Sequence, residues 1–423
     1  MKKTAILLSC VLLSSVLAAQ SPSETIVVPG FAPERLSRID RVMQQYVDDG
    51  RLAGAVALVL RDGQPVYERA FGWSDKEGGR RMATDTIFRI ASQTKAITSV
   101  AVLALMEEGK VGLNDPVSRF IPAFAKTTVA VQNDGGVSIV QATRPISIRH
   151  LLTHTAGISY GTDRHVATQY ESKGLGPAAG NGWYTADKEE PICETMERLA
   201  TLPFVEQPGE KWVYGYNTDV LGCVVERAAG MPLDEFIRTR ITDPLGMKDT
   251  RFFLPASERH RLSAVYASDG DGRITRAPDG ARGQGTYVEG PNRSFSGGAG
   301  LLSTARDYAR FLEMIRNGGA LGPVRILAPR TVKLMTTNMV GSLHSAAGLG
   351  FGLGFETTDQ YGANGMDGQG AFGWAGAYGT MYRIDPQARL VIVLMIQLMP
   401  NRTDIRTVFP TLVYQALMDS PTR

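Results

Sequence analysis

The feature that most constrains this chain is a serine and a lysine three residues apart, Ser92 and Lys95, at the start of a strongly apolar segment. The residues from Ala96 to Glu108 are dense enough in apolar and small side chains for a buried helix, and Gly109 follows as its C-terminal stop. Residues three apart share one helix face, so the amine comes within reach of the hydroxyl, in the positive field of the helix N-terminus. This arrangement is typical of an activated nucleophile.

The N-terminus has the features of an export signal. Two lysines follow the initiator methionine, an apolar run extends to Leu17, and two small residues, Ala18 and Ala19, come next. These are the three regions of a secretory signal peptide, so we expect residues 1–19 to be cleaved and the protein to be periplasmic or secreted. A lipoprotein is the weaker alternative, because the apolar run before Cys10 is too short and continues past it.

The composition of the chain limits which kinds of molecule it is expected to bind. The chain has 423 residues, 43% of them hydrophobic, and a formal net charge of only +3, of which the signal peptide carries Lys2 and Lys3. No basic surface is therefore expected for nucleic acid, and no other apolar run is long enough to cross a membrane. Only Cys193 and Cys223 remain in the mature chain; they could pair, but their number excludes a disulfide framework or a Cys-rich metal site. We expect no cofactor and no metal, and the oligomeric state stays open.

Strand and helix patterns predict an α+β fold. A helix over 34–46 precedes a hairpin formed by 54–60 and 66–70, and a second hairpin, 379–384 with 390–398, precedes a final helix over 403–418. Hairpins at both ends indicate one antiparallel sheet flanked by helices. We therefore expect a sheet lobe from 20–98 and 300–423, an inserted, mostly helical lobe from 99–299, and the active site between the lobes.

Two further motifs supply what a serine nucleophile needs, a proton acceptor and an oxyanion site. The first follows a Pro-Gly turn and contains Tyr214, Tyr216 and Asn217. The second is a glycine-rich run that contains Trp374, Ala375, Gly376 and Ala377.

With these motifs the chain resembles the serine β-lactamase and penicillin-binding superfamily, and most closely the class C β-lactamase-like carboxylesterases called family VIII esterases. Ser92 and Lys95, then Tyr214, then Trp374-Ala375-Gly376 match the family's three motifs in order and at comparable spacing. The resemblance also covers 151–157, 243–247 and 296–304, and so nearly the whole mature chain. It implies a β-lactamase/transpeptidase-like fold.

The resemblance also assigns roles. It makes Ser92 the nucleophile, Lys95 and Tyr214 the proton-transfer pair, and the backbone N–H groups of Ser92 and Ala377 the oxyanion site. Five residues would bind the substrate: Trp374, Ala375, Gly376, Tyr216 and Asn217. Tyr216 occupies the position where class C β-lactamases have the asparagine of Y-x-N, and Trp374 replaces the lysine of K-T-G. Because that lysine helps to hold a substrate carboxylate, its loss favours neutral esters as substrates.

The chemistry can be expected from the residues themselves. Among apolar neighbours, desolvation would disfavour the ammonium form of Lys95, which could then take the Ser92 proton directly or through Tyr214. The two groups would act as a coupled pair whose proton is not assigned to either. His154, in the segment that precedes Gly157, is expected to be structural.

Three alternatives stay open. Ser159 lies in a G-x-S-x-G pattern, but an apolar strand should precede such a nucleophile, and here the preceding segment is helical. A β-lactamase or D-alanyl-D-alanine carboxypeptidase would use the same Ser92, Lys95 and Tyr214. A non-catalytic cell-wall binding module would keep the fold without the reaction, although all three chemical positions are retained.

Overall fold

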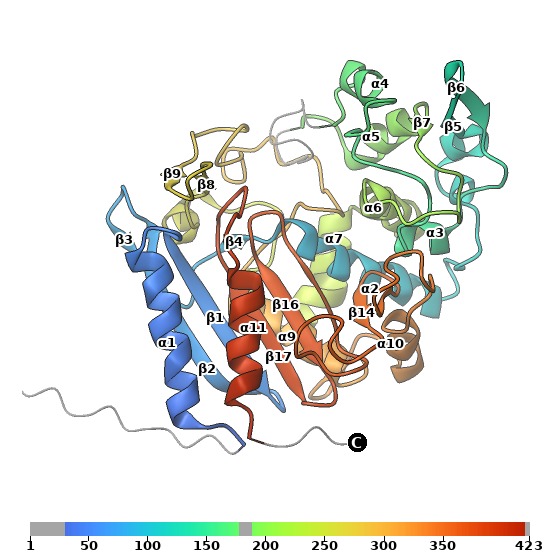
Figure 1. Cartoon of the computed structure of the whole chain (residues 1–423). Helices are drawn as coiled ribbons and strands as arrows, with labels where there is room; N and C mark the ends of the chain where they lie inside the picture. Colours follow the sequence, from blue (N-terminus) through green and yellow to red (C-terminus); the bar gives the residue numbers. More distant parts are fainter. Residues whose placement is uncertain (1–29, 177–187, 419–423) are drawn as a thin grey trace, which may run out of the picture.

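A computed structural model of the chain describes residues 30–176 and 188–418. Its centre is an eight-stranded sheet in which every neighbouring pair is antiparallel (Figure 1). The strands, in spatial order, are β13 (Leu349–Phe351), β14 (Glu356–Thr358), β15 (Phe372–Ala375), β16 (Met381–Asp385), β17 (Leu390–Met395), β1 (Gly54–Arg61), β2 (Gln64–Asp75) and β3 (Arg80–Arg81). The predicted antiparallel sheet is therefore confirmed, and it joins the two ends of the chain.

The middle of the sheet is its most apolar part. Strands β1 and β17 pair directly, with Val56 opposite Met395 and Leu60 opposite Val391. Both strands are buried over nearly their whole length, as expected for strands covered on both faces. Segments more than 300 residues apart therefore form one hydrophobic core.

Helices cover both faces of the sheet. Helices α1 (Pro33–Asp48) and α11 (Ile405–Ala416) lie side by side on one face, where Ile39 and Phe409 pack in the same core cluster as Ile392 (Figure 1). The other face carries α9 (Ala305–Arg316), which contacts β1, β16 and β17. The short strand β4 (Phe88–Arg89) pairs with β10 (Leu302–Ser303) and leads through a 3-10 turn, η1 (Ala91–Gln93), into α2 (Thr94–Glu107).

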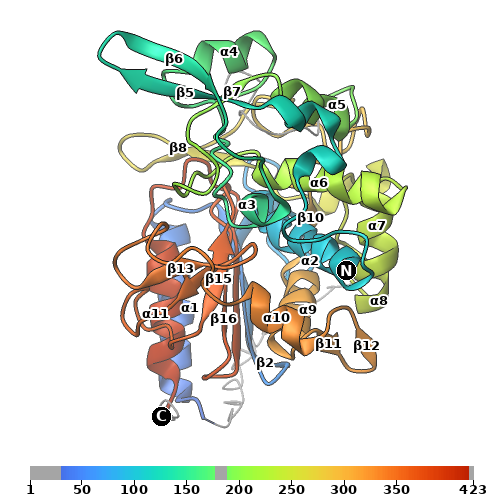
Figure 2. The same ribbon diagram turned by 90° about the vertical axis from the view of Figure 1, so that its right-hand side faces the viewer.

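In the region predicted as an inserted lobe, α6 (Asn217–Ala229) packs on α2 (Figure 2). The other helices of this region are short: η2 (Val117–Arg119), η3 (Pro122–Lys126), α3 (Ile148–Leu152), α4 (Ala167–Ser172), α5 (Ile192–Leu199), α7 (Leu233–Ile237), the π-helical turn η4 (Arg238–Thr242), α8 (Asp243–Leu245) and η5 (Ala256–Arg261). A disulfide between Cys193 and Cys223 joins α5 to α6.

The inserted lobe also contains strands that the helical prediction missed. The hairpin β5 (Thr128–Asn133) and β6 (Gly136–Gln141) pairs with β7 (Pro203–Phe204), and β8 (Tyr266–Ser268) pairs with β9 (Ile274–Arg276). The remaining elements are the small hairpin β11 (Ala320–Leu321) with β12 (Val324–Arg325), and α10 (Pro329–Met335). Within the described residues, no helix combines the length and apolarity needed to cross a bilayer. The expected signal peptide, residues 1–19, lies outside the described residues.

Candidate active site

Ser92 lies in the 3-10 turn η1, directly before α2, and contacts from other segments hold this turn in place. The residue before Ser92, Ala91, has a φ of 42°, which is unusual for an L-residue and marks local backbone strain. Around it, Tyr308 donates a hydrogen bond to the Gln93 carbonyl, and Thr94 accepts one from the Leu301 amide through its side chain. The Ser92 side chain stays partly exposed while the residues around it are buried.

Lys95 lies one helical turn further and is only 2% exposed. Its Nζ donates to Ser92 Oγ at 3.2 Å, to the Tyr160 hydroxyl at 3.0 Å and to the Gly298 carbonyl at 2.8 Å. Three acceptors match the three N–H donors of an ammonium group. The expected pairing of Ser92 with Lys95 is therefore present.

Tyr214 faces the same amine with its ring. Lys95 Nζ lies 4.8 Å from the Tyr214 ring centroid, while the Tyr214 hydroxyl accepts a hydrogen bond from Trp374 Nε1 at 3.1 Å. The Tyr160 ring packs edge to face against Tyr214, with 5.6 Å between the centroids. Serine, lysine and tyrosine thus meet in one place, as the three motifs predicted.

The sequence motifs assigned no role to Tyr160, although it accepts a hydrogen bond from Lys95. It belongs to the G-x-S-x-G segment, and its neighbour Ser159 is buried, with Oγ accepting a hydrogen bond from the Gly161 amide. Ser159 does not line the cavity beside Ser92. In this segment, Tyr160 and not Ser159 therefore belongs to the candidate site, because Tyr160 accepts a hydrogen bond from Lys95.

Ser92, Tyr160 and Tyr214 border a cavity of about 520 Å³, whereas the buried Lys95 is not among its lining residues. The lining combines aromatic and small residues with polar and charged ones; it consists of Ser92, Tyr160, Tyr214, Glu356, Asn364, Trp374, Ala375, Gly376, Ala377, Met381, Arg383, Arg406 and Thr407. The cavity is large enough for a small organic substrate.

The edge of β15 approaches the nucleophile closely because of one glycine. A Cβ built on Gly376 would lie 2.5 Å from the Ile90 carbonyl oxygen and 2.2 Å from Thr380 Oγ1. Only glycine fits there without displacing the Ile90 backbone, which leads directly into the Ser92 turn. Trp374, Ala375, Gly376 and Ala377 all line the cavity, as predicted for this motif.

Tyr216 and Asn217 need a correction, because neither lines the cavity. The Tyr216 hydroxyl accepts a hydrogen bond from the Gly176 amide, and burial raises the pKa of that hydroxyl. Asn217 is fully buried, and its Nδ2 contacts the carbonyls of Ile158 and Val213 and the Nδ1 of His154. Since α6 begins at Asn217, the side chains after Tyr214 turn inward into the helical lobe.

His154 supports Tyr214 from behind. Its ring centroid lies 4.9 Å from that of Tyr214, and the residue is 1% exposed. Burial, with the nearby Lys95 charge as a smaller cause, holds the pKa of His154 well below its usual range. The imidazole is therefore neutral at ordinary pH and does not line the cavity, in agreement with a structural role.

A buried carboxylate lies behind the lysine. Asp219 Oδ1 accepts from the Gly298 amide at 3.2 Å and from Ser296 Oγ, so the peptide that presents its carbonyl to Lys95 is fixed by α6. A Cβ on Gly298 would lie 2.3 Å from Asp219 Oδ2. Burial raises the pKa of Asp219, and the Lys95 charge opposes this. The glycine-rich segment 296–300 thus serves to position the lysine.

The chain belongs to the beta-lactamase family, whose sequence model matches residues 39–410. It is similar to Esterase EstB of Burkholderia gladioli, with 36% identity over 373 residues that cover 85% of this chain and 89% of the relative. A putative D-alanyl-D-alanine carboxypeptidase of Escherichia coli K12 is 30% identical over 424 residues, covering 93% of this chain and 90% of the relative.

A solved structure supports the same assignment. The structure of EstCE1, described as a hydrolase with promiscuous acyltransferase activity, superposes with a TM-score of 0.75 at 29% identity, over 91% of this chain and 99% of that one. The family and the relatives make this protein a serine hydrolase with a β-lactamase-like fold.

Proposed function

We propose that this protein is an exported carboxylesterase that cleaves small esters through an acyl-enzyme on Ser92. The observation that carries the proposal is the 3.2 Å contact between Lys95 Nζ and Ser92 Oγ at the wall of the 520 Å³ cavity. In this mechanism Ser92 Oγ attacks the ester carbonyl carbon, and its proton passes to the pair formed by Lys95 and Tyr214.

The backbone N–H groups of Ser92 and Ala377 would bind the oxyanion that forms, because both residues border the cavity. The pair then protonates the leaving alcohol. Water enters, gives its proton to the same pair and attacks the acyl carbon, which releases the acid and restores Ser92.

Neutral esters fit this cavity for a specific reason. The residue that replaces the family's lysine, Trp374, uses its indole N–H on the Tyr214 hydroxyl, so it presents an apolar ring and no cation next to the nucleophile. Tyr160, Tyr214, Trp374 and Met381 line the same cavity and favour an apolar acyl or alcohol group.

A peptidase or β-lactamase activity is the second candidate, and Arg406 favours it. Arg406 lines the cavity and, among the described residues, no carboxylate forms an ion pair with it. It could meet the carboxylate of a D-alanyl peptide or a β-lactam. One of the relatives bears a carboxypeptidase name, which keeps this candidate open.

The test is intact-mass analysis of the mature protein after incubation with a short-chain nitrophenyl ester, a chromogenic cephalosporin and a D-alanyl-D-alanine peptide. We expect ester turnover and an acyl adduct that digestion maps to Ser92. Ser92→Ala should lose both, and Ser159→Ala, the matched control, should keep both. Faster turnover of the cephalosporin or the peptide would favour the second candidate. Absence of labelling by a fluorophosphonate probe would instead support a binding module.

Export is part of the proposal and rests on the N-terminal sequence, with the Cys193–Cys223 disulfide as support, since disulfides persist in oxidising compartments. Expression in a Gram-negative host followed by fractionation should place the protein in the periplasm. N-terminal sequencing should show cleavage after Ala18 or Ala19. Full-length protein in the cytoplasm would contradict this part.

A further inference from the structure

A second cavity, of about 170 Å³, shares no lining residue with the first. It is bordered by the end of β2, by β3 and β4, and by the segment 259–289. Its lining is strongly charged. Four arginines, Arg80, Arg89, Arg259 and Arg276, come from four separate segments of the chain.

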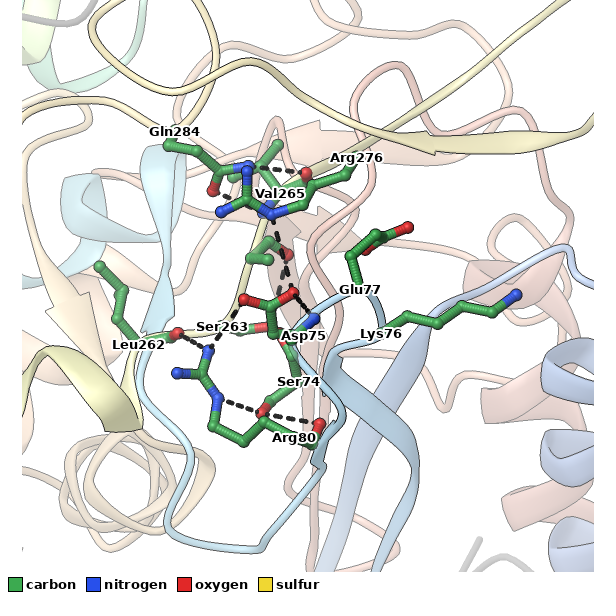
Figure 3. A network of polar contacts seen from close by, with 12 residues as sticks. Ser74, Asp75, Lys76, Glu77, Arg80, Leu262, Ser263, Val265, Arg276 and Gln284 are labelled. Carbon is green, nitrogen blue, oxygen red and sulfur yellow. Dashed lines mark hydrogen bonds and ion pairs between the residues drawn. The ribbon is translucent and has the colours of Figure 1, made fainter.

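The acidic residues of the lining are already paired with three of these arginines. Asp75 lies between Arg80 and Arg276, at 4.0 and 3.7 Å, as Figure 3 shows. Arg276 also contacts Asp279 at 3.0 Å, and Arg259 pairs with Glu289. Three carboxylates therefore face four guanidinium groups.

Arg89 is the arginine left without a carboxylate. It is 3% exposed, and its Nε donates to the Gln284 carbonyl at 2.7 Å while Nη1 donates to the Ser263 carbonyl at 2.6 Å and to Gln397 Oε1 at 3.3 Å. All of these acceptors are neutral. Within the described chain, Nη2 has no acceptor and no carboxylate forms an ion pair with Arg89.

A buried cation with no carboxylate in ion-pair contact is costly, and burial accordingly lowers the pKa of Arg89, although the charge of Glu289 in the same lining opposes this in part. A guanidinium group remains charged nonetheless, so neutral carbonyls solvate it without cancelling its charge. The free Nη2 presents two N–H donors in the plane that suits a carboxylate or phosphate oxygen. At about 30 Å³ per water molecule in the liquid, the cavity volume corresponds to about six water molecules, which is sufficient for one small oxyanion.

We propose that this second cavity is a binding site for a small oxyanion, such as phosphate or a carboxylate, with Arg89 as the central ligand. Arg80 and Arg276 add positive charge at its mouth, while Asp75 limits how much of that charge faces the anion. The bound anion would neutralise Arg89 and stabilise the segment 259–289 against β3 and β4.

The test measures thermal unfolding of the full chain in increasing inorganic phosphate, with chloride added to hold the ionic strength constant. A specific site gives a saturable rise in Tm, because a ligand that binds only the folded state stabilises it by mass action. Direct titration calorimetry with phosphate and, separately, with acetate gives each Kd. A response to phosphate alone identifies a tetrahedral oxyanion, and a response to both identifies a general carboxylate and phosphate site.

Two variants at the cavity mouth make opposite predictions. Arg276→Gln removes one cation and leaves Asp75 less neutralised, so we expect phosphate to bind about tenfold more weakly. Asp75→Asn removes the competing carboxylate, so binding should become about tenfold tighter. Arg227→Gln, on the exposed face of α6 and paired with Glu197, is the matched control and should bind as the wild type does. Both mouth residues are partly exposed, so folding of these variants is expected.

Phosphate also stabilises proteins without binding, because it is excluded from their surface. This effect raises Tm continuously with phosphate concentration, and by the same amount in all variants. That outcome, or the absence of heat on titration with both anions, would overturn the proposal. So would a change in the same direction for Arg276→Gln and Asp75→Asn.

Discussion

At the scale of single residues, the site depends on how Lys95 shares its hydrogen bonds. Two tyrosines face the amine, and they differ in their contacts: Tyr160 bonds Nζ through its hydroxyl, while Tyr214 presents its ring and bonds Trp374. A tyrosine that carries the proton needs its hydroxyl group for the reaction itself. A tyrosine that only orients the lysine amine contributes one hydrogen bond to it. The two hydroxyls should therefore differ in importance.

We expect Tyr214→Phe to lower kcat for a nitrophenyl ester by about 100-fold or more, as for loss of a general acid–base group. Tyr160→Phe should lower it by about tenfold, the effect of one hydrogen bond to a charged donor. Tyr361→Phe, whose side chain is 68% exposed, should leave the rate unchanged. Steady-state kinetics would check all three. The reverse order would transfer the proton-carrying role to Tyr160.

A second residue-scale prediction concerns acid stability. Because burial holds the pKa of His154 below its usual value, the unfolded chain binds a proton near pH 6.5 that the folded protein does not bind. The contribution of His154 to the free energy of unfolding is therefore fully present above pH 6.5. Below pH 6.5 this contribution decreases by about 1.4 kcal/mol for each pH unit.

His154→Gln should therefore lose less unfolding free energy than the wild type between pH 6.5 and pH 5, as measured by urea denaturation. The exposed His260→Gln is the control and should follow the wild-type curve. Parallel curves for His154→Gln and the wild type would contradict the assignment of a neutral buried imidazole.

At the scale of elements, α6 connects the two halves of the site. Tyr214 lies in the loop before its N-terminus, and Asp219 in its first turn holds Gly298, whose carbonyl accepts a hydrogen bond from Lys95. The Cys193–Cys223 disulfide ties α6 to α5. The position of α6 is therefore maintained by packing against α2 and by a covalent link.

Removing that link should destabilise the protein. The two cysteines are 30 residues apart, and a loop of that size corresponds to about 3 to 4 kcal/mol of lost stability in the chain-entropy description. We expect the double variant Cys193→Ser with Cys223→Ser to show this loss in chemical denaturation, and a reductant to reproduce it in the wild type. A change below about 1 kcal/mol, within the known range for disulfides, would mean that packing alone holds α6 in place.

At the scale of the whole molecule, the chain closes on itself through the sheet. Strand β17 lies between β16 and β1, and α11 packs against α1 on the outer face. The last described helix contributes Ile405, Phe409 and Val413 to the core, all fully buried. Burying one such side chain contributes about 1.5 to 3 kcal/mol, and a whole domain has about 5 to 15 kcal/mol of stability.

A chain ending at Thr403 should therefore fail to fold. We expect it to be insoluble, or to lack a cooperative thermal transition by circular dichroism. A chain ending at Met418 retains every described residue of the C-terminal segment, and it should unfold like the full-length protein. Cooperative unfolding of the shorter chain would show that α11 is dispensable for the core.

The sequence by itself determined the antiparallel sheet and the pairing of Ser92 with Lys95, because these depend on short-range patterns: alternation in strands and a three-residue spacing on one helix face. Through its resemblance to a family with the same order of motifs, it also indicated Tyr214 and the strand that contains Trp374. Only the tertiary structure decided that Tyr160 bonds Lys95, that Tyr216 and Asn217 turn inward, and that Arg89 lacks a carboxylate. These features depend on contacts between segments up to 300 residues apart, whose relative placement is set by packing of the whole core and not by any local pattern.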